Sequence, residues 1–479
     1  MRALGIDVGT STTKLVLIAV EGENVREVAT HATPTPGDVP GLLAAISTGC
    51  RRLADHSGAI EAVGVASMAE TGAPIDAYGE ALTELLRWDA GHGAADAVAM
   101  AVLAPEVFAR TGVRVSAKTP LTTWRWLQRE RPDVWRRMRT WLSTADLAVH
   151  ALTGERVTDH TLAGRTGGYP LAGPGERPAV AFDAELLDLA GLDPARLPRV
   201  AASDSVAGRV SSAAAAATGL TAGTAVVVAG HDHQVAAWAA GVRAPGDVAD
   251  SLGTAEATLS VLSGRPEPEG VRRQGMSLVR TVGGQADAVV AGTSSAGAML
   301  DHWLVGVPPE SRADVLARAA REVVTGQQPT GAAVAPYLRG RQSPEPDPGA
   351  AAGAPPPGWP RERQARAVVE GICYQARWMI ETQLAPASPQ RVAVIGGRRL
   401  PALWRELKRV TLPWPVSSVS TGEPVAAGAA LLALARTGAL GDVATALSHA
   451  PTLATTSEPP PAWDAHGDAY DTFIRRVRG

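Results

Sequence analysis

The sequence contains little of several residue types, and each shortage excludes a class of protein. Two of its 479 residues are cysteines, too few for the disulfide framework of a small secreted domain. The net charge is only −3, so no excess of either sign indicates binding to nucleic acid or to an anionic membrane. No apolar run approaches the roughly 18–20 residues of a membrane span, and Asp7 stands where a signal peptide would need its apolar core. We therefore expect a cytoplasmic protein without a nucleic-acid or membrane partner.

What the sequence does contain is typical of a large globular protein. Hydrophobic residues make up 45% of the chain and charged residues 19%, and the chain is too long for a single core. A polar hinge at 242–250 separates residues 1–243 from residues 244–479. Both halves open with a strand, a Gly-Thr turn and a second strand, at 3–20 and at 250–262. We predict an α/β protein of two related domains.

Two helical segments indicate core packing rather than ligand binding. Residues 120–153 favour two or three helices with tryptophans on their buried faces: Trp124, Trp126, Trp135 and Trp141. The Ala-rich segment 421–438 predicts a buried helix that ends at Gly438.

The first Gly-Thr turn lies in GIDVGTSTTK and has the composition of a phosphate-binding turn. Glycine, serine and threonine let backbone N–H groups and hydroxyls point at one spot, which suits phosphate oxygens. Lys14 adds a cation, whereas Asp7 would repel phosphate unless Mg²⁺ lies between them. A plain hairpin with a polar turn would look similar. The second turn, at Gly253 and Thr254, favours the phosphate interpretation, because one such turn in each half fits a nucleotide held between two domains.

The stretch GHDHQVAAWAAG at 230–241 follows an apolar run and admits three interpretations. A metal site at His231, Asp232 and His233 would need further ligands at suitable spacing, and the sequence shows no companion motif. Asp232 could simply cap the helix that follows. It could also be the base of a phosphoryl transfer, since a carboxylate at a helix N-terminus stays ionised and this chemistry requires positioning of the hydroxyl more than basicity.

Four motifs in this order resemble the FGGY family of carbohydrate kinases, in the actin-like ATPase-domain superfamily. They are D-x-G-T-[ST]-x-x-[KR] at 7–14, G-x-D at 230–232, L-G-T at 252–254, and G-G…LW…E-x-x-x-x-G-A-A-L-L-A at 396–433. The resemblance covers nearly the whole chain, and its xylulokinase-like branch is the nearest. It implies two actin-like (ribonuclease H-like) domains, each a mixed five-stranded sheet flanked by helices, with a cleft between them. It also implies ATP, Mg²⁺ and a small sugar as ligands, and it permits a homodimer.

The resemblance assigns roles to individual residues. Asp232 would be the base that orients and deprotonates a sugar hydroxyl, and Asp7 would hold Mg²⁺ through water. The nucleotide and its phosphates would be contacted by Thr10, Ser11, Thr12, Lys14, Gly253, Thr254, Gly297, Asp301, Gly396 and Gly397. The N-terminal domain, 1–243, would bind sugar and phosphate and carry the base, and the C-terminal domain, 244–479, would bind the nucleotide.

The chain departs from the family pattern near the sugar and near the adenosine. Candidates for sugar contact are Met68, Glu70, Thr71, Trp88, Asp89, His231 and His233. The family's W-x-D-x-R element is only approximate in LLRWDAGHG, where the arginine is missing after the aspartate. Near the adenosine, GGRRLPALW carries Arg398 and Arg399 where relatives have small residues.

These observations predict an ATP-dependent kinase for a hydroxyl of a ketopentose, a ketohexose or a polyol. The alternative is a non-catalytic regulator that binds sugar or nucleotide on the same fold. The altered GGRRLP turn favours the regulator, whereas Asp7, Lys14, Asp232 and Thr254 favour the enzyme.

Overall fold

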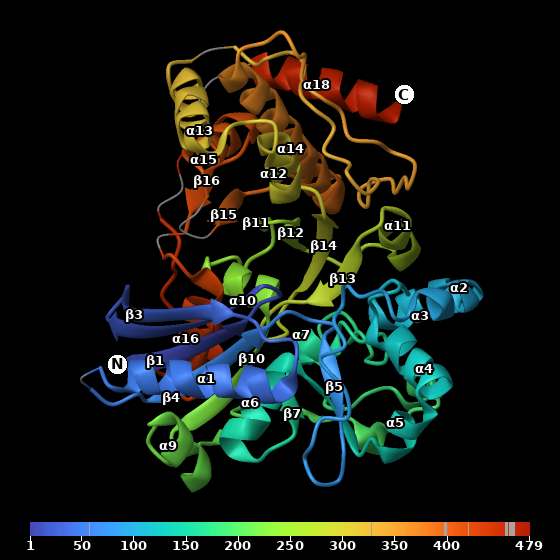
Figure 1. Ribbon diagram of the computed structural model, residues 1–479, viewed down its shortest axis with the longest axis vertical. Helices are drawn as coiled ribbons and strands as arrows, with labels where there is room; N and C mark the ends of the chain where they lie inside the picture. Colours follow the sequence, from blue (N-terminus) through green and yellow to red (C-terminus); the bar gives the residue numbers. More distant parts are fainter. Residues whose placement is uncertain (57, 327, 397–399, 420, 456–457, 459–464) are drawn as a thin grey trace.

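Two mixed six-stranded sheets form the two halves of the protein (Figure 1), seen in a computed structural model that describes residues 1–479 apart from 57, 327, 397–399, 420, 456–457 and 459–464. The first sheet has the order β3 (Asn24–Pro34), β2 (Thr12–Glu21), β1 (Arg2–Val8), β4 (Ala62–Ser67), β10 (Ala225–His231) and β9 (Gly208–Arg209). The second has the order β13 (Ser277–Arg280), β14 (Asp287–Thr293), β12 (Glu256–Val261), β11 (Asp247–Leu252), β15 (Arg391–Gly396) and β16 (Val416–Ser418).

The α/β architecture of two flanked mixed sheets is confirmed, with one difference in strand number. Each sheet has six strands instead of five. The edge strands β9 and β16 contain only two and three residues, too few to show the alternating pattern by which a strand is recognised in a sequence. Two further ribbons pair β5 (Gly72–Ile75) with β6 (Thr140–Ser143), and β7 (Val157–Thr158) with β8 (Arg199–Val200).

Helices cover both faces of each sheet. One face of the first sheet packs on α1 (Val39–Ala54), α6 (Thr144–Thr153) and α9 (Ser212–Thr218), and its other face packs on α16 (Pro424–Arg436). The helix α10 (Asp232–Ala239) lies between the sheets, because Val235 and Trp238 pack beside α16 while Ala236 and Ala237 pack on the second sheet. The far face of the second sheet packs on α14 (Arg361–Leu384).

The remaining helices form the outer parts of the two halves. Those of the first half are α2 (Ala94–Ala99), η1 (Ala101–Leu103), α3 (Ala104–Thr111), α4 (Pro120–Glu130), α5 (Pro132–Arg137), α7 (His160–Ala163), α8 (Ala184–Asp188) and η2 (Pro194–Arg196). Those of the second half are α11 (Pro268–Arg273), α12 (Gly297–Leu304), α13 (Pro309–Val324), α15 (Ala402–Thr411), α17 (Val443–His449) and α18 (Ala465–Arg478). Among the described residues, none of these helices has both the length and the apolar character needed to cross a bilayer.

The tryptophans predicted to pack in the core do so. Trp124 and Trp141 are buried with their rings edge to face, 6.1 Å apart, and Trp126 and Trp135 pack partly buried against the same cluster. One detail of the prediction is wrong: Trp141 lies on the strand β6, which interrupts the expected helices.

The helix α16 belongs to the second half of the sequence but packs directly on the first sheet. A Cβ atom added to Gly5 on β1 would lie 1.7 Å from the carbonyl oxygen of Ala426, and one added to Gly64 on β4 would lie 1.9 Å from that of Ala429. The helix backbone therefore touches the strand backbones, which only glycine permits. Gly438 follows the helix with a φ of 77°, as a C-terminal glycine should.

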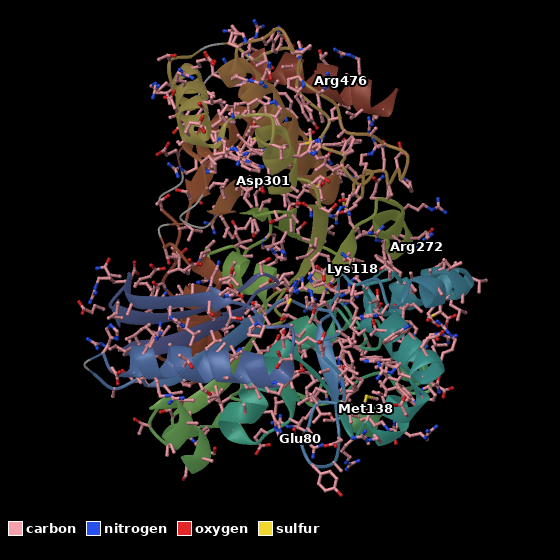
Figure 2. All side chains as sticks on the ribbon, in the orientation of Figure 1. Glu80, Lys118, Met138, Arg272, Asp301 and Arg476 are labelled. Carbon is pink, nitrogen blue, oxygen red and sulfur yellow. The ribbon has the colours of Figure 1, made fainter. Side chains whose placement is uncertain are left out.

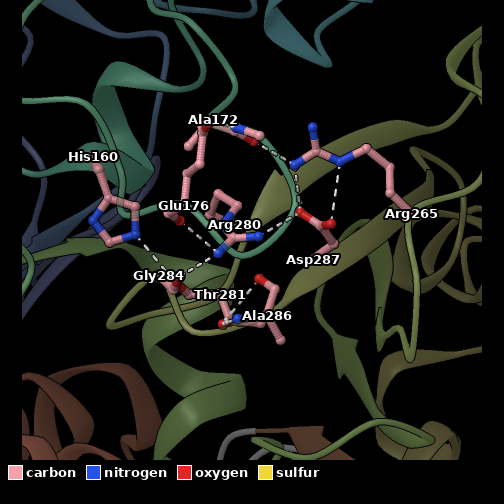
Figure 3. Close-up of polar contacts among 10 residues, drawn as sticks. His160, Ala172, Glu176, Arg265, Arg280, Thr281, Gly284, Ala286 and Asp287 are labelled. Atoms are coloured by element: carbon pink, nitrogen blue, oxygen red, sulfur yellow. Dashed lines mark hydrogen bonds and ion pairs between the residues drawn. The ribbon is translucent and has the colours of Figure 1, made fainter.

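Several polar contacts join the two halves (Figure 3). Nε2 of His160 donates to the carbonyl oxygen of Thr281 at 3.1 Å, and Arg280 donates to the carbonyl oxygen of Glu176 at 3.0 Å. Asp287 accepts bonds from both Arg280 and Arg265. The loop after α7 is thereby held against the β13–β14 hairpin.

A buried ion triad joins the strands on either side of the second Gly-Thr turn. Nζ of Lys408, on α15, lies 2.6 Å from Oδ2 of Asp250 on β11 and 2.6 Å from Oε1 of Glu256 on β12, and all three side chains are fully buried. Burial raises the pKa of Glu256 well above its usual value, and the two carboxylates raise the pKa of Lys408 although burial opposes them. The triad holds in place the strand ends that carry Gly253 and Thr254.

Replacing Gly64 tests the backbone contact of α16. Gly64→Ala should lower the free energy of unfolding by about 3 kcal/mol or more, because the new methyl group overlaps a helix carbonyl that cannot move alone. Gly37→Ala is the matched control, since a Cβ there meets no atom within 4 Å. Denaturant unfolding of both variants measures the difference, and equal stability would contradict the contact.

Replacing Lys408 tests the ion triad. Lys408→Met leaves two buried carboxylates without their cation and should lower the free energy of unfolding by about 3–5 kcal/mol. Arg405→Met, on the exposed side of the same helix, should change it by less than about 0.5 kcal/mol. Urea unfolding followed by circular dichroism gives both values, and a loss below about 1 kcal/mol for Lys408→Met would show that the triad does not stabilise the fold.

Candidate active site

Three parallel strands of the first sheet bring the N-terminal motifs to one edge. The apolar runs of β4 and β10 are buried throughout, as expected for strands covered on both faces. In the register of the sheet, Val8 of β1 and His231 of β10 both pair with Ser67 of β4. The carboxyl ends of these strands therefore lead together into the segments that carry Thr10, Glu70 and Asp232.

The first Gly-Thr turn is tied to the loop that follows β5. Oγ1 of Thr10 accepts a 3.0 Å bond from the indole N–H of Trp88, and its carbonyl oxygen accepts a 3.0 Å bond from Arg87. Arg87 also donates to both carboxylate oxygens of Asp89, from Nε at 3.0 Å and from Nη2 at 2.8 Å. Arg87, which precedes Trp88, thus pairs with Asp89, although no arginine follows the aspartate as in the family element.

Two of the residues expected at the sugar lie beneath this loop. Met68 is 3% exposed and contacts Oγ1 of Thr10 through its sulfur at 3.5 Å. Thr71 is 1% exposed, and its hydroxyl accepts the backbone N–H of Trp88 at 3.1 Å. Both side chains support the position of Trp88. In the turn itself Ser11 is exposed and Thr12 is half-buried.

Asp232 begins α10 and lies between two histidines. Its Oδ1 is 3.1 Å from Nε2 of His231 and accepts the backbone N–H of His233 at 2.6 Å. Burial alone would raise the pKa of Asp232, but the charges of His233 and His231 and these two bonds hold it below its ordinary range. The two imidazole rings stand edge to face, 5.5 Å apart. Asp232 is therefore an ionised carboxylate whose orientation is set by its neighbours.

The backbone that presents Asp232 depends on a bulge at Gly230. The register of β10 against β4 shifts between Val228 and Gly230, which has a φ of 124°. A Cβ on Gly230 would lie 2.2 Å from Oγ1 of Thr161, the hydroxyl that accepts the N–H of His231 at 2.9 Å. The bulge turns the chain so that Asp232 starts the helix at the sheet edge.

Asp7 is a second carboxylate at this edge. Burial, followed by the negative charges of Asp232 and Glu423, raises the pKa of Asp7 to about 8, against the opposing effect of Lys14. Lys14 forms an ion pair with Glu423 at the start of α16, with 2.7 Å between Nζ and Oε2. The site therefore contains more negative charge than its one lysine offsets.

The residues at Asp7 fit a divalent cation. Oδ1 of Asp7 is buried and accepts no hydrogen bond from any residue that the structure describes, and carboxylate oxygens are ligands that Mg²⁺ prefers. Within the same described residues, no group of three or more His, Cys, Asp or Glu side chains is arranged to hold a metal ion. Protein ligands would thus supply only part of the coordination shell, as is usual for Mg²⁺ bound together with phosphates.

Glu70 faces this edge from a strained backbone position. Its φ is 63°, in the left-handed region that non-glycine residues rarely adopt. Oε1 accepts two bonds from Arg165, at 3.1 and 2.7 Å. Burial would raise the pKa of Glu70, but the charges of Arg165, Lys118 and His231 hold it below its usual range. The ion pair with Arg165 stabilises the strained backbone conformation of Glu70.

The second half brings four of its predicted residues to one edge of its own sheet. Leu252 pairs with Gly396 in the register of β11 and β15, so the second Gly-Thr turn leaves the sheet beside Gly396. The N–H of Gly297 donates to the carbonyl oxygen of Gly253 at 3.1 Å, and a Cβ on Gly297 would lie 2.4 Å from that oxygen. Gly253 and Thr254 are themselves exposed.

The other predicted nucleotide residues differ in position. Asp301 is exposed on α12 in the second half (Figure 2), one turn beyond Gly297. Gly397, Arg398 and Arg399 lie outside the described residues. Next to Gly396 lies a cavity of about 570 Å³, bounded by Leu400 and Arg405 from the second half and by Arg26 and Glu27 of β3.

Several residues of the site were not predicted from the sequence. Arg87, Arg165 and Glu423 are each paired with a predicted residue, and Thr161 positions His231. Arg165 and Thr161 lie about 70 to 95 positions from their partners, so no local pattern could join them. Arg87 could have been found, since it stands two residues before Asp89.

Comparison with known proteins gives matches over both halves. The N-terminal domain of the FGGY family of carbohydrate kinases matches residues 2–239, and the C-terminal domain of the same family matches residues 248–436. The gluconokinase of Bacillus subtilis (strain 168) is 23% identical over 466 residues, which cover 91% of this chain and 87% of that protein. The xylulose kinase of Streptomyces rubiginosus is 30% identical over 298 residues, which cover 60% of this chain and 57% of that protein.

Solved structures agree in fold. Gluconate kinase from Lactobacillus acidophilus superimposes with a TM-score of 0.85 at 18% identity, covering 100% of this chain and 97% of that one. Xylulose kinase from the same organism gives a TM-score of 0.84 at 19% identity, covering 100% and 98%. Both family domains, in order and over most of the sequence, confirm the resemblance read from the motifs. The chain belongs to the FGGY family of carbohydrate kinases and is a sugar kinase.

Proposed function

We propose that this kinase transfers the γ-phosphoryl group of ATP to a hydroxyl of a small sugar, with Asp232 as the general base. The observation that carries the proposal is the pair of carboxylates at the ends of β1 and β10. Asp232 is held ionised between His231 and His233, while Asp7 keeps a buried oxygen without a hydrogen-bond partner among the described residues. One carboxylate is placed to receive a proton and the other to attract a cation.

Asp232 acts mainly by positioning. Its bonds with His231 and the N–H of His233 set the direction of the carboxylate, so that a sugar hydroxyl donating to it points toward the phosphoryl group. The transition state of phosphoryl transfer is loose, so the hydroxyl proton passes late and a carboxylate of low pKa suffices as its acceptor. The oxygen of the hydroxyl forms the new P–O bond as the bond to ADP breaks.

The first turn supplies the phosphate contacts on the sugar side. Thr10, Ser11, Thr12 and Lys14 surround the same strand end as Asp7, and Mg²⁺ bound there would neutralise charge on the phosphate oxygens. Lys14 is held by Glu423 through an ion pair of 2.7 Å. We propose that ATP phosphates compete with Glu423 for Lys14 when they bind.

Residues 244–479 would bind the nucleotide, and residues 1–243 the sugar. The exposed turn at Gly253 and Thr254 offers the hydroxyl of Thr254 to the phosphates, while the N–H of Gly253 donates to the carbonyl oxygen of Ala255 within the turn. The cavity of about 570 Å³ beside Gly396 is of a size that accepts an adenosine. The edge of β3 also bounds this cavity, so the two halves would close on the nucleotide together.

The sugar is proposed to be a ketopentose, a ketohexose, a polyol or a sugar acid. Relatives named gluconokinase, xylulose kinase and L-fuculokinase support a small sugar of this kind, and the xylulokinase-like branch stays a prediction. We place the enzyme in the cytoplasm, where ATP is supplied, and its two cysteines are buried and unpaired. The ordered geometry around Asp232 favours catalysis over a purely regulatory role.

Replacing the proposed base gives the main test. Asp232→Asn should lower kcat for sugar-dependent ADP release by about 10²–10⁴-fold, while ATP and sugar still bind in calorimetry. Asp188→Asn, at an exposed position on α8, should leave kcat unchanged. Activity within tenfold of wild type in Asp232→Asn would exclude Asp232 as the base. Sugar binding without ADP release in the wild-type protein would favour the regulator instead.

Replacing Gly297 tests the nucleotide site. Gly297→Ala places a methyl group against the carbonyl oxygen of Gly253, so the turn must move and the KM for ATP should rise about tenfold, or 1.4 kcal/mol. The KM for the sugar should change much less. Gly270→Ala on α11, where a Cβ has open space, is the control. If the KM for the sugar rose and that for ATP did not, the assignment of the two halves would be wrong.

A further inference from the structure

Three basic residues gather around Glu70 at the sugar side of the site. Arg165 binds the carboxylate of Glu70 directly. Glu70 attracts Lys118, whereas Arg165 repels both Arg114 and Lys118. Arg114 in turn repels Lys118. Arg114 and Lys118 come from the segment that leads into α4. The proposed mechanism does not use any of these three cations.

The cluster has only one carboxylate, which does not offset the positive charge of its three basic side chains. Glu70 offsets Arg165, with which it shares two hydrogen bonds. Across the part of the chain that the structure describes, neither Arg114 nor Lys118 forms an ion pair with an acidic side chain. Arg272, which also acts on Arg114, is itself paired with Glu269. The cluster therefore carries two cations without a counter-charge.

Both cations lie close to other positive charges, which makes the missing counter-charge costly. The charge of Glu70 favours the ammonium form of Lys118, yet burial and the charges of Arg165 and Arg114 lower its pKa. Burial, followed by Arg165 and Arg272, lowers the pKa of Arg114. The side chain of Lys118 is nevertheless open to solvent. Arg114 is half-buried, so a small ligand can reach both side chains.

The cluster is continuous with the proposed catalytic groups. Nζ of Lys118 lies 5.7 Å from the ring centre of Trp88, whose indole N–H binds Thr10 in the phosphate turn. On the other side, the charge of His231, which is next to Asp232, acts on Glu70. Figure 2 shows Lys118 at the level where the two halves of the molecule meet. A sugar with one hydroxyl at Asp232 would extend its other end toward Lys118 and Arg114.

The segment that carries these cations is held in place by its own hydrogen bonds. Oγ1 of Thr119 donates to the carbonyl oxygen of Arg114 at 3.0 Å and accepts the N–H of Ser116 at 3.2 Å. Thr122 closes the loop through a 2.8 Å bond to the carbonyl oxygen of Ser116. Because the backbone is fixed at both cations, the position offered to a ligand is preformed.

We propose that the sugar substrate is anionic, with an acidic group bound by Arg114 and Lys118 at the end of the molecule remote from the phosphorylated hydroxyl. This inference rests on the proposed kinase function and narrows its substrate class. The acidic group is a carboxylate, as in an aldonate, or a phosphate monoester, since both accept hydrogen bonds from arginine and lysine. A neutral sugar would leave both cations unpaired in the closed site, so the acid should be preferred strongly.

The test compares substrates that differ only in the acidic group. D-gluconate is set against D-glucitol, D-xylonate against xylitol, and D-glucose 1-phosphate against D-glucose, with ATP, Mg²⁺ and ADP release as readout. For at least one pair the acid should have kcat/KM at least about 100-fold above its neutral partner. Preference for the aldonates identifies a carboxylate site, and preference for the sugar phosphate identifies a phosphate site.

Two variants then test which side chains cause the preference for the acidic sugar. Lys118→Met and Arg114→Met should each lower the ratio of kcat/KM for the acid to that for the neutral partner by about 10–100-fold, chiefly through the KM of the acid. The ratio is measured within one protein, so a loss of folded enzyme cancels. Arg131→Met removes a positive charge from the opposite end of α4 and should leave the ratio unchanged.

The outcomes separate this inference from the proposed function. Neutral sugars used as well as or better than every acid would overturn the inference and leave the kinase function intact. An unchanged ratio in both variants would also overturn it. If calorimetry showed selective binding of the acid but no sugar released ADP, the anionic site would stand and the kinase function would fail. No binding of any acid would count against the inference.

Discussion

The packing of α16 on the first sheet is the constraint on which the rest of the structure depends. Gly5 and Gly64 remove the side chains that would separate the helix from β1 and β4, so the backbones of helix and strands lie in direct contact. The central strands and the helix are alanine- and glycine-rich for the same reason, since larger residues could not fill so narrow a space. The helix α16, from the C-terminal part of the chain, thereby becomes part of the core around the N-terminal sheet.

The two ends of α16 contact residues at or next to the candidate active site. At its N-terminus Glu423 pairs with Lys14 of the phosphate turn. At its C-terminus Arg436 binds Asp159 at 3.0 Å and the carbonyl oxygen of Val228 at 2.7 Å, close to the bulge that presents Asp232. Because one helix contacts the proposed phosphate turn and the strand that carries the proposed base, a shift of α16 would displace both. This coupling would transmit the proposed closure of the two halves to the candidate site.

The charges around Asp232 and Asp7 give these two carboxylates different protonation preferences. Two histidines and a backbone N–H keep Asp232 ionised, whereas burial beside that charge disfavours ionisation of Asp7. A bound cation would reverse this preference at Asp7. On the sugar side the sign of the charge is opposite, because the cations around Glu70 outnumber the carboxylates. Charge is thus distributed along the candidate site, from negative around Asp7 and Asp232 to positive around Glu70.

The sequence by itself determined the two strand–turn–strand openings, the helix that ends at Gly438, and the motifs with Asp7, Asp232 and Thr254, because each depends on residues close together in the chain. From these motifs the family and the fold class could be predicted, and Asp232 as the base stays a prediction. Only the tertiary structure decided that Arg165 holds Glu70, that Arg87 pairs with Asp89, that Met68 and Thr71 lie beneath Trp88, and that α16 packs on the first sheet. Most of these contacts join residues far apart in sequence, and their partners are chosen by sheet register and by the space left between backbones, which no local pattern of residues records.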